Sequence, residues 1–208
     1  MQDIEVEIRQ LANKYSLKLT EQLQLRKLEM ENDDLSHFLI YQVLGISDNE
    51  GLLIDQYQNK GRFLYKYAGS FLESATKLCF KYAFNDSGSL KIPNTLGNRP
   101  KTFEIDCLCG TNAIEIKWRD ATTDGDHITK EHTRIQVIKN AGFIPVRIMF
   151  YYPNRQQAMK IQQALKTLYL GIGGYYYCCD EAWEYIELQT NINLKEILEK
   201  IAKEKSDE

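Results

Sequence analysis

Hydrophobic residues in the first 60 positions recur at the spacing of amphipathic helices. Ile4, Ile8, Leu11 and Tyr15 form the clearest stripe. A second helix is predicted over residues 38–44, where it ends at Gly45. The segment Ser47-Asp48-Asn49-Glu50 has the S-x-x-E form of a capping box, which predicts the start of another short helix.

The next segment, residues 60–85, predicts one long helix that is aromatic, basic and free of proline. A turn-rich stretch follows, and then two alternating segments, 101–109 and 112–118, are joined by Gly110-Thr111 as in a β-hairpin. Residues 127–141 predict a helix ended by Gly142, and residues 143–150 an apolar strand.

The rest of the chain adds a helix opened by Pro153, a loop in the segment GIGGYYYCC and two C-terminal helices. This order predicts an α/β domain over residues 60–208 and a helical annex over residues 1–59. The chain starts without a signal-peptide core and has no apolar run of membrane-spanning length, so we expect a cytoplasmic protein with no membrane partner.

Charge is distributed unevenly along the 208 residues. The formal net charge is −3, but residues 60–160 hold 16 basic and 9 acidic residues, while both flanking segments are acidic. A basic centre favours a polyanionic partner. Acidic surface helices around a neutral core would produce the same totals, so charge alone leaves both interpretations open.

The five cysteines form no C-x-x-C pair, and we expect them to be reduced apolar side chains. The predicted hairpin carries the candidate chemistry. A two-residue turn at Gly110-Thr111 places Asp106 opposite Glu115 and Glu104 opposite Lys117, and strict alternation puts these four side chains on one face. Phe103, Ile105, Cys107, Ile114, Ile116 and Trp118 would then lie on the other face.

Two interpretations fit this polar face. Cross-strand ion pairs on a solvated strand are common and contribute about 0–1 kcal/mol. Opposed like charges such as Asp106 and Glu115 are destabilising unless a cation neutralises them, and Mg²⁺ prefers hard oxygen ligands. We favour the metal site, because a hairpin between a helix and an αβ unit is usually covered on both faces.

At these residues the chain resembles the PD-(D/E)XK nuclease superfamily. The matching residues are Asp106 and Glu115-Ile116-Lys117, with Ile105 in place of the signature's proline. The helix 60–85, the hairpin, the helix 127–141 and the strand 143–150 match the superfamily's α-β-β-β-α-β core if a strand near Leu90–Ile92 supplies the first β. Residues 60–190 are also similar to type II restriction endonucleases of the ApaLI-like group.

The resemblance implies a fold, an activity and a set of site residues. The fold would be a restriction-endonuclease-like core, a mixed β-sheet flanked by helices. Asp106 and Glu115, with the carbonyl of Ile116, would hold Mg²⁺, and Lys117 would orient or deprotonate the attacking water. Many members also use a glutamate from the preceding helix. Here that residue would be Glu73, unless it is simply an exposed helical side chain; Glu104 would be an indirect partner of Lys117.

DNA contacts are expected from residues that suit base edges or phosphates. The loop after the second hairpin strand is dense in such groups, although its acids would equally suit the N-terminus of the following helix, the role we prefer for Asp126. The candidates for base contact are Arg119, Asp120, Thr123, Asp124 and His127. The candidates for phosphate contact are Lys130, Arg134, Asn98 and Arg99. The helical annex over residues 1–59 is a further candidate for DNA contact or for dimerisation.

The preferred function is a homodimeric, Mg²⁺-dependent restriction endonuclease that cuts double-stranded DNA in host defence, beside a DNA methyltransferase that protects the host. Two alternatives stay open: a structure-specific nuclease such as a junction resolvase, and a DNA-binding regulator without enzymatic activity.

Overall fold

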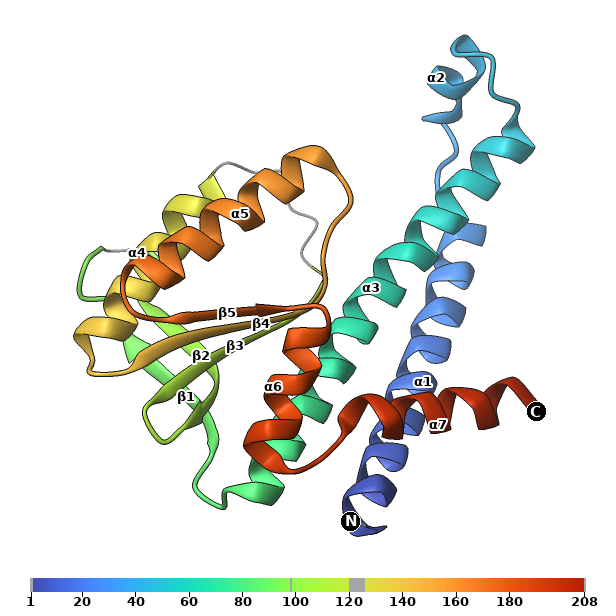
Figure 1. Ribbon diagram of the computed structural model, residues 1–208. Coiled ribbons are helices and arrows are strands. Elements are labelled where there is room, and N and C mark those ends of the chain that lie inside the picture. Colours follow the sequence, from blue (N-terminus) through green and yellow to red (C-terminus); the bar gives the residue numbers. More distant parts are fainter. Residues whose placement is uncertain (1, 98, 120–125, 208) are drawn as a thin grey trace. The chain divides into compact units, whose positions relative to one another are not determined.

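The computed structural model describes residues 2–97, 99–119 and 126–207 (Figure 1). The chain divides into two compact units, one of residues 10–71 and one of residues 1–9 with 72–208. These units are defined by contacts within the chain, so the predicted domain boundary after residue 59 stays a prediction. Among the described residues, no helix is both long and apolar enough to cross a membrane.

The unit of residues 10–71 is helical, as predicted. It contains most of α1 (Gln2–Glu31), α2 (Phe38–Val43) and the first part of α3 (Asp48–Ala83). The capping box at the start of α3 is confirmed, because the backbone N–H of Ser47 donates to Glu50 Oε2 at 3.1 Å. One prediction was wrong: the short helix after Ser47 and the helix 60–85 are one continuous helix, since no proline interrupts the segment that joins them.

The other unit is built on a five-stranded mixed sheet in the order β1-β2-β3-β4-β5. The first three strands are antiparallel, and β3, β4 and β5 are parallel. The strands are β1 (Gly88–Pro93), β2 (Thr102–Cys109), β3 (Asn112–Arg119), β4 (Ile144–Tyr151) and β5 (Tyr175–Cys178). The predicted hairpin is therefore confirmed as β2 and β3, with Gly110 at a positive φ of 56° in the turn.

Helices cover both faces of this sheet (Figure 1). On one face, α4 (Asp126–Asn140) and α5 (Gln156–Gly171) pack on β4 through Ile135, Met149 and Leu165. On the other face lie α6 (Asp180–Thr190) and the C-terminal part of α3, where Phe150 of β4 contacts Trp183 with ring centroids 4.3 Å apart. The expected α/β core with flanking helices is confirmed.

The segment GIGGYYYCC was expected to be a loop, and that prediction was wrong. Its aromatic part is β5, the edge strand parallel to β4. Three consecutive tyrosines have a high β-propensity, and the preceding glycines permit a close approach to β4, where a Cβ on Gly174 would collide with the carbonyl oxygen of Pro145.

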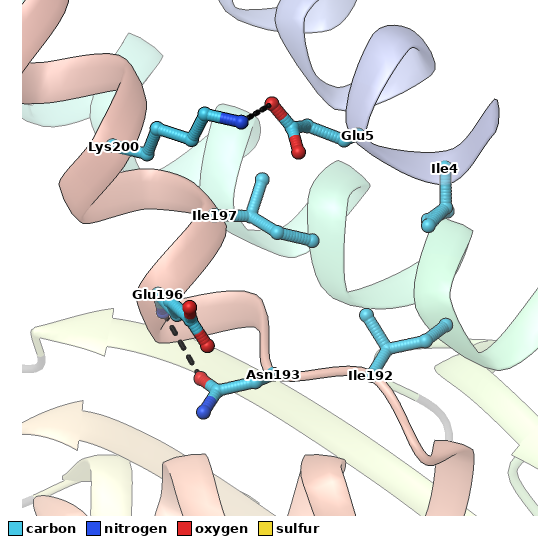
Figure 2. A pocket seen from close by; sticks show the side chains of 7 residues that line it. All are labelled: Ile4, Glu5, Ile192, Asn193, Glu196, Ile197 and Lys200. Carbon is cyan, nitrogen blue, oxygen red and sulfur yellow. Dashed lines mark hydrogen bonds and ion pairs between the residues drawn. The ribbon is translucent and has the colours of Figure 1, made fainter. Parts of the chain in front are cut away.

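Helix α7 (Leu194–Asp207) packs beside the first turns of α1, which belong to the same unit. The two helices line a pocket of about 190 Å³, shown in Figure 2. Two of its charged groups pair with each other across the pocket, with Lys200 Nζ 2.7 Å from Glu5 Oε1. We therefore interpret this pocket as part of the packing of α1 on α7.

Candidate active site

The site is built around an irregularity in β2. Gly88 of β1 pairs with Leu108, but Leu90 pairs with Ile105, so Asp106 and Cys107 together lie opposite the single residue Ser89. This is the arrangement of a β-bulge, which reverses the alternation of side chains and re-aims them. The carbonyl of Asp106 accepts a hydrogen bond of 2.9 Å from Ser89 Oγ.

The bulge corrects the predicted faces of the hairpin. The predicted register is found at the turn end, where Cys107 pairs with Ile114 and Leu108 with Ala113. Beyond the bulge, Phe103 and Ile105 pack in one cluster with Ala113, on the side of the sheet that also carries Glu115. Strict alternation through β2 was therefore the wrong assumption, because it ignored the extra residue.

Asp106 is tied to β3 by its side chain rather than by strand pairing. Its carboxylate oxygen Oδ2 accepts the backbone N–H of Ile116 at 2.8 Å. The N–H and C=O of one strand residue point to the same edge of the strand, so the carbonyl of Ile116 faces β2 as well. The carboxylate of Asp106 and the backbone carbonyl of Ile116 therefore lie on the facing edges of β2 and β3.

Glu115 and Lys117 complete the group. Glu115 is 4% exposed, and its Oε1 lies 2.7 Å from Lys117 Nζ. Its Oε2 is paired with the guanidinium of Arg134 from α4. The buried carboxylate of Glu115 is thus held between two cations. The side chain of Lys117 is 38% exposed, whereas that of Arg134 is 12% exposed.

The two carboxylates differ in their proton affinity. Burial and the nearby Glu115 raise the pKa of Asp106 to about 7, although the hydrogen bond from Ile116 and the charge of Lys117 act against this. For Glu115, burial opposes ionisation, but Arg134 and Lys117 outweigh it and lower the pKa. Burial likewise disfavours the charge of Lys117, yet Glu115 raises the pKa of its ammonium.

The donor set fits a hard divalent cation. Two carboxylates and one carbonyl offer oxygen ligands only, as Mg²⁺ prefers. Burial and the nearby Glu115 raise the pKa of Asp106, and a bound cation would act in the opposite direction. Among the described residues no three His, Cys, Asp or Glu side chains form a cluster, so any such site would need the carbonyl of Ile116 or water to complete it.

Two further acids were expected near these residues. Glu73, on α3, adds to the rise in the pKa of Asp106, so the structure brings it within electrostatic reach of the site. Lys77 Nζ lies 3.4 Å from its Oε1. Glu104 lies elsewhere: it is exposed beside Lys91 Nζ at 3.7 Å, and no ion pair joins it to Lys117 within the described part of the chain.

The expected DNA-contacting residues are only partly brought together. Arg99 and Lys130 are exposed, and His127 is half-buried in the first turn of α4. Arg119, at the end of β3, reaches Asn154 with Nη2 3.5 Å from Oδ1. Four of the candidates lie outside the described residues: Asn98, Asp120, Thr123 and Asp124.

Arg134 was expected at a DNA phosphate, but the structure places it inside the protein. Its side chain is 12% exposed and bound to Glu115, and its Nη2 also donates to the carbonyl of Glu104 at 2.6 Å. The expectation counted Arg134 as a basic residue on a surface helix. The helix instead turns this face toward β2 and β3.

Sequence reasoning missed three buried polar residues behind Glu115. They are Glu131 of α4, Arg147 of β4 and Tyr169 of α5, which are 5%, 0% and 1% exposed. A signal for one of them was present, because Arg147 interrupts the otherwise apolar strand FIPVRIMFYY. A charged residue inside a buried strand needs a charged partner.

One comparison with known proteins identifies a family. A model of the family described as ApaLI-like restriction endonuclease matches residues 1–203 of the 208. No curated protein and no solved structure matches the chain. The family match spans both compact units and includes Asp106, Glu115 and Lys117. On this evidence, the chain belongs to the ApaLI-like restriction endonuclease family.

Proposed function

We propose that this restriction endonuclease is a type II enzyme that uses Mg²⁺ to hydrolyse both strands of duplex DNA at a specific sequence. The observation that carries the proposal is the β2 bulge, which holds Asp106 against Ile116 beside the buried pair of Glu115 and Lys117. In a family of restriction endonucleases, this arrangement supports the chemistry of the PD-(D/E)XK superfamily.

Asp106 and Glu115, with the carbonyl of Ile116, are the residues that would hold the metal. When bound, Mg²⁺ supplies positive charge that polarises a phosphate oxygen and lowers the pKa of a bound water. Asp106 would then keep its negative charge, because a cation bound to its carboxylate favours the ionised form against the effect of burial.

Lys117 acts on the nucleophile and on the phosphate. Its ammonium, with Nζ 2.7 Å from Glu115 Oε1, donates a hydrogen bond that orients the attacking water, and its charge offsets the charge that develops on the phosphate oxygens. The water oxygen forms a bond to phosphorus as the bond from phosphorus to the 3′-oxygen breaks. The attacking water gives up one proton to the solvent and the departing 3′-oxygen takes one up, which leaves 5′-phosphate and 3′-hydroxyl ends. Glu73 of α3, whose charge acts on Asp106, would help to orient the water.

Binding and biological setting follow from the same proposal. The exposed cations Arg99 and Lys130 contact phosphates, and the residues around Arg119 and His127 contact base edges. A homodimer presents two such sites to the two strands of a palindromic sequence. In the cytoplasm the enzyme defends its host against foreign DNA, beside a methyltransferase that protects the host's own sites.

Plasmid cleavage tests this proposal. Supercoiled plasmid incubated with the protein and Mg²⁺ should yield a small set of discrete linear fragments, and chelation with EDTA should abolish them. End-labelling should find 5′-phosphates. Cleavage confined to branched DNA would support a junction resolvase instead. A gel shift without any cleavage would support a DNA-binding regulator and overturn the proposal.

A further inference from the structure

A network of buried charges lies behind Glu115, on the face of the sheet covered by α4 and α5. Arg147 of β4 is fully buried, and Glu131 and Tyr169 are 5% and 1% exposed. Apolar side chains surround this group, including Ile135, Ile161 and Leu165. None of these polar residues is used in the hydrolysis proposed above.

The network reaches the active site through Arg134. On one side, this guanidinium pairs with Glu115; on the other, its Nη1 lies 3.9 Å from Glu131 Oε2. Glu131 Oε1 in turn accepts hydrogen bonds from the hydroxyl of Tyr169 at 2.5 Å and from Arg147 Nη1 at 3.3 Å. The contacts therefore run from Tyr169 and Arg147 to Glu131, then to Arg134 and Glu115.

Stability alone is a weak reason for such a network. Desolvating several charges costs more than most buried ion pairs return, and apolar residues of similar volume are often as stable. The network does fix geometry. Because Arg134 is anchored by Glu131 and by the carbonyl of Glu104, it holds Oε2 of Glu115 and leaves Oε1 on the side of Lys117.

The charges also balance. The three carboxylates Asp106, Glu115 and Glu131 face the three cations Lys117, Arg134 and Arg147. A divalent cation added to this set makes the site net positive, which matches the negative charge of an incoming phosphodiester. Substituting Glu131, Arg147 or Tyr169 therefore changes the surroundings of Glu115 without altering Asp106 or Lys117.

We propose that Glu131, Arg147 and Tyr169 are positioning residues that act through Arg134 to orient the Glu115 carboxylate for metal binding. The inference rests on the proposed function, since it assumes that Glu115 is a metal ligand. Partners of this indirect kind typically change metal affinity 10- to 100-fold when they are removed.

The test is the pair Tyr169→Phe and Tyr176→Phe. The first change removes the hydrogen bond to Glu131, with almost no change in volume. Tyr176 is a matched control: it is 4% exposed, lies on the same face with its ring centroid 6.3 Å from that of Tyr169, and donates to Gln162 at 2.9 Å, outside the network. Both variants lose the hydrogen bonds of one buried tyrosine hydroxyl, which for Tyr176 also include a contact of 3.8 Å to Met149 Sδ.

The readout is Mn²⁺ binding to the DNA-free protein, followed by electron paramagnetic resonance of the free ion. We expect Tyr169→Phe to raise the dissociation constant about tenfold or more and Tyr176→Phe to leave it near the wild-type value. The half-saturating Mg²⁺ concentration for cleavage should shift with it. Glu131→Gln should show the same change, and it carries the test if Tyr169→Phe does not fold.

Equal Mn²⁺ affinity in wild type, Tyr169→Phe and Glu131→Gln, with cleavage intact, would overturn the inference and leave the proposed function standing. A parallel loss of affinity in Tyr176→Phe would also overturn it, because the effect would then be a general consequence of weaker packing. A wild-type protein that neither binds Mn²⁺ nor cuts DNA would overturn the proposed function together with the inference.

Discussion

At the scale of residues, the candidate site depends on one backbone irregularity that no periodicity reveals. The types and spacing of Asp106, Glu115 and Lys117 are visible in the sequence, and so is the turn that joins their strands. The position of Asp106 is set by the bulge opposite Ser89, which depends on pairing with a strand far away in the sequence. The ion-pair partners of Glu104 and Arg134 could not be predicted for the same reason, because they lie on other elements of the fold.

Asp106→Asn should abolish cleavage while the fold survives. The amide oxygen can still accept the N–H of Ile116, so the bulge keeps its hydrogen bond, but the negative charge for the metal is lost. We expect the rate of plasmid cleavage to fall at least about 100-fold. Lys117→Ala should cause a loss of about 10²- to 10⁴-fold, because it removes the group that acts on water and phosphate.

The matched control for these variants is Glu104→Gln, two residues from Asp106 in the same strand. Its side chain is exposed beside Lys91 rather than Lys117, so cleavage should stay close to the wild-type rate. Gel shifts in Ca²⁺ should show DNA binding by all three proteins. Wild-type turnover in Asp106→Asn or Lys117→Ala would show that other residues carry the chemistry.

Thiol reactivity tests the packing around the site independently. Burial raises the pKa of Cys79 and of Cys107 to about 12, and both side chains are buried, whereas Cys179 is exposed. Iodoacetamide at pH 8 reacts with thiolates, so the native protein should be alkylated at Cys179 while Cys79 and Cys107 stay unmodified. Peptide mass spectrometry identifies the alkylated cysteines, and in denaturant all five cysteines should react. Rapid labelling of Cys107 in the native protein would contradict the packing described for the β2 bulge.

At the scale of elements, helices and strands with strong periodicity were predictable, and their connections were less so. The hairpin, α4 and β4 follow directly from alternation and from turn residues. Helix α3 was divided in the prediction because a capping box marks a start but says nothing about length. Strand β5 was missed because its glycines are typical of loops, although they serve close packing against β4.

Gly174→Ala should destabilise the sheet edge. A Cβ at this position would meet the Pro145 carbonyl oxygen, lie 2.9 Å from Pro145 Cγ and lie 3.0 Å from the carbonyl oxygen of Tyr169, so the start of β5 would have to move. Overpacking of this kind costs about 1–3 kcal/mol. The melting temperature, followed by circular dichroism, should fall by several degrees.

The control is Gly171→Ala, three residues earlier at the end of α5. Nothing lies within 4 Å of a Cβ there, and alanine favours a helix, so stability should be unchanged or slightly higher. If the two variants had the same melting temperature, the close approach of β5 to β4 would not constrain the structure.

At the scale of the whole molecule, the distribution of charge matters more than its sum. The net charge of −3 conceals a basic central segment, residues 60–160, and this segment holds every residue proposed for the metal site and for DNA contact. Several of its acids face cations inside the protein, including Glu115 and Glu131, so they offer little repulsion to a phosphate outside. An acidic protein can therefore present a surface that attracts DNA.

Salt should weaken DNA binding steeply. Each phosphate neutralised by a lysine or arginine releases counterions, so the logarithm of affinity falls linearly with the logarithm of salt concentration, with a slope near −0.9 per contact. With several contacts per protomer, affinity should fall at least about tenfold between 50 and 200 mM salt. Fluorescence anisotropy of a labelled duplex with the Asp106→Asn variant measures this without cleavage.

Two lysine variants locate the contacts. Lys130 is exposed on α4 within the basic segment, whereas Lys203 is exposed on α7 within the acidic C-terminal segment. Both substitutions to glutamine remove one positive charge, so the net charge changes equally. If the phosphate surface lies in the central segment, Lys130→Gln should make the salt slope shallower by about one unit per protomer, and Lys203→Gln should leave it unchanged. Equal effects would mean that DNA responds only to the total charge, and a flat slope for the parent protein would contradict a phosphate-binding surface altogether.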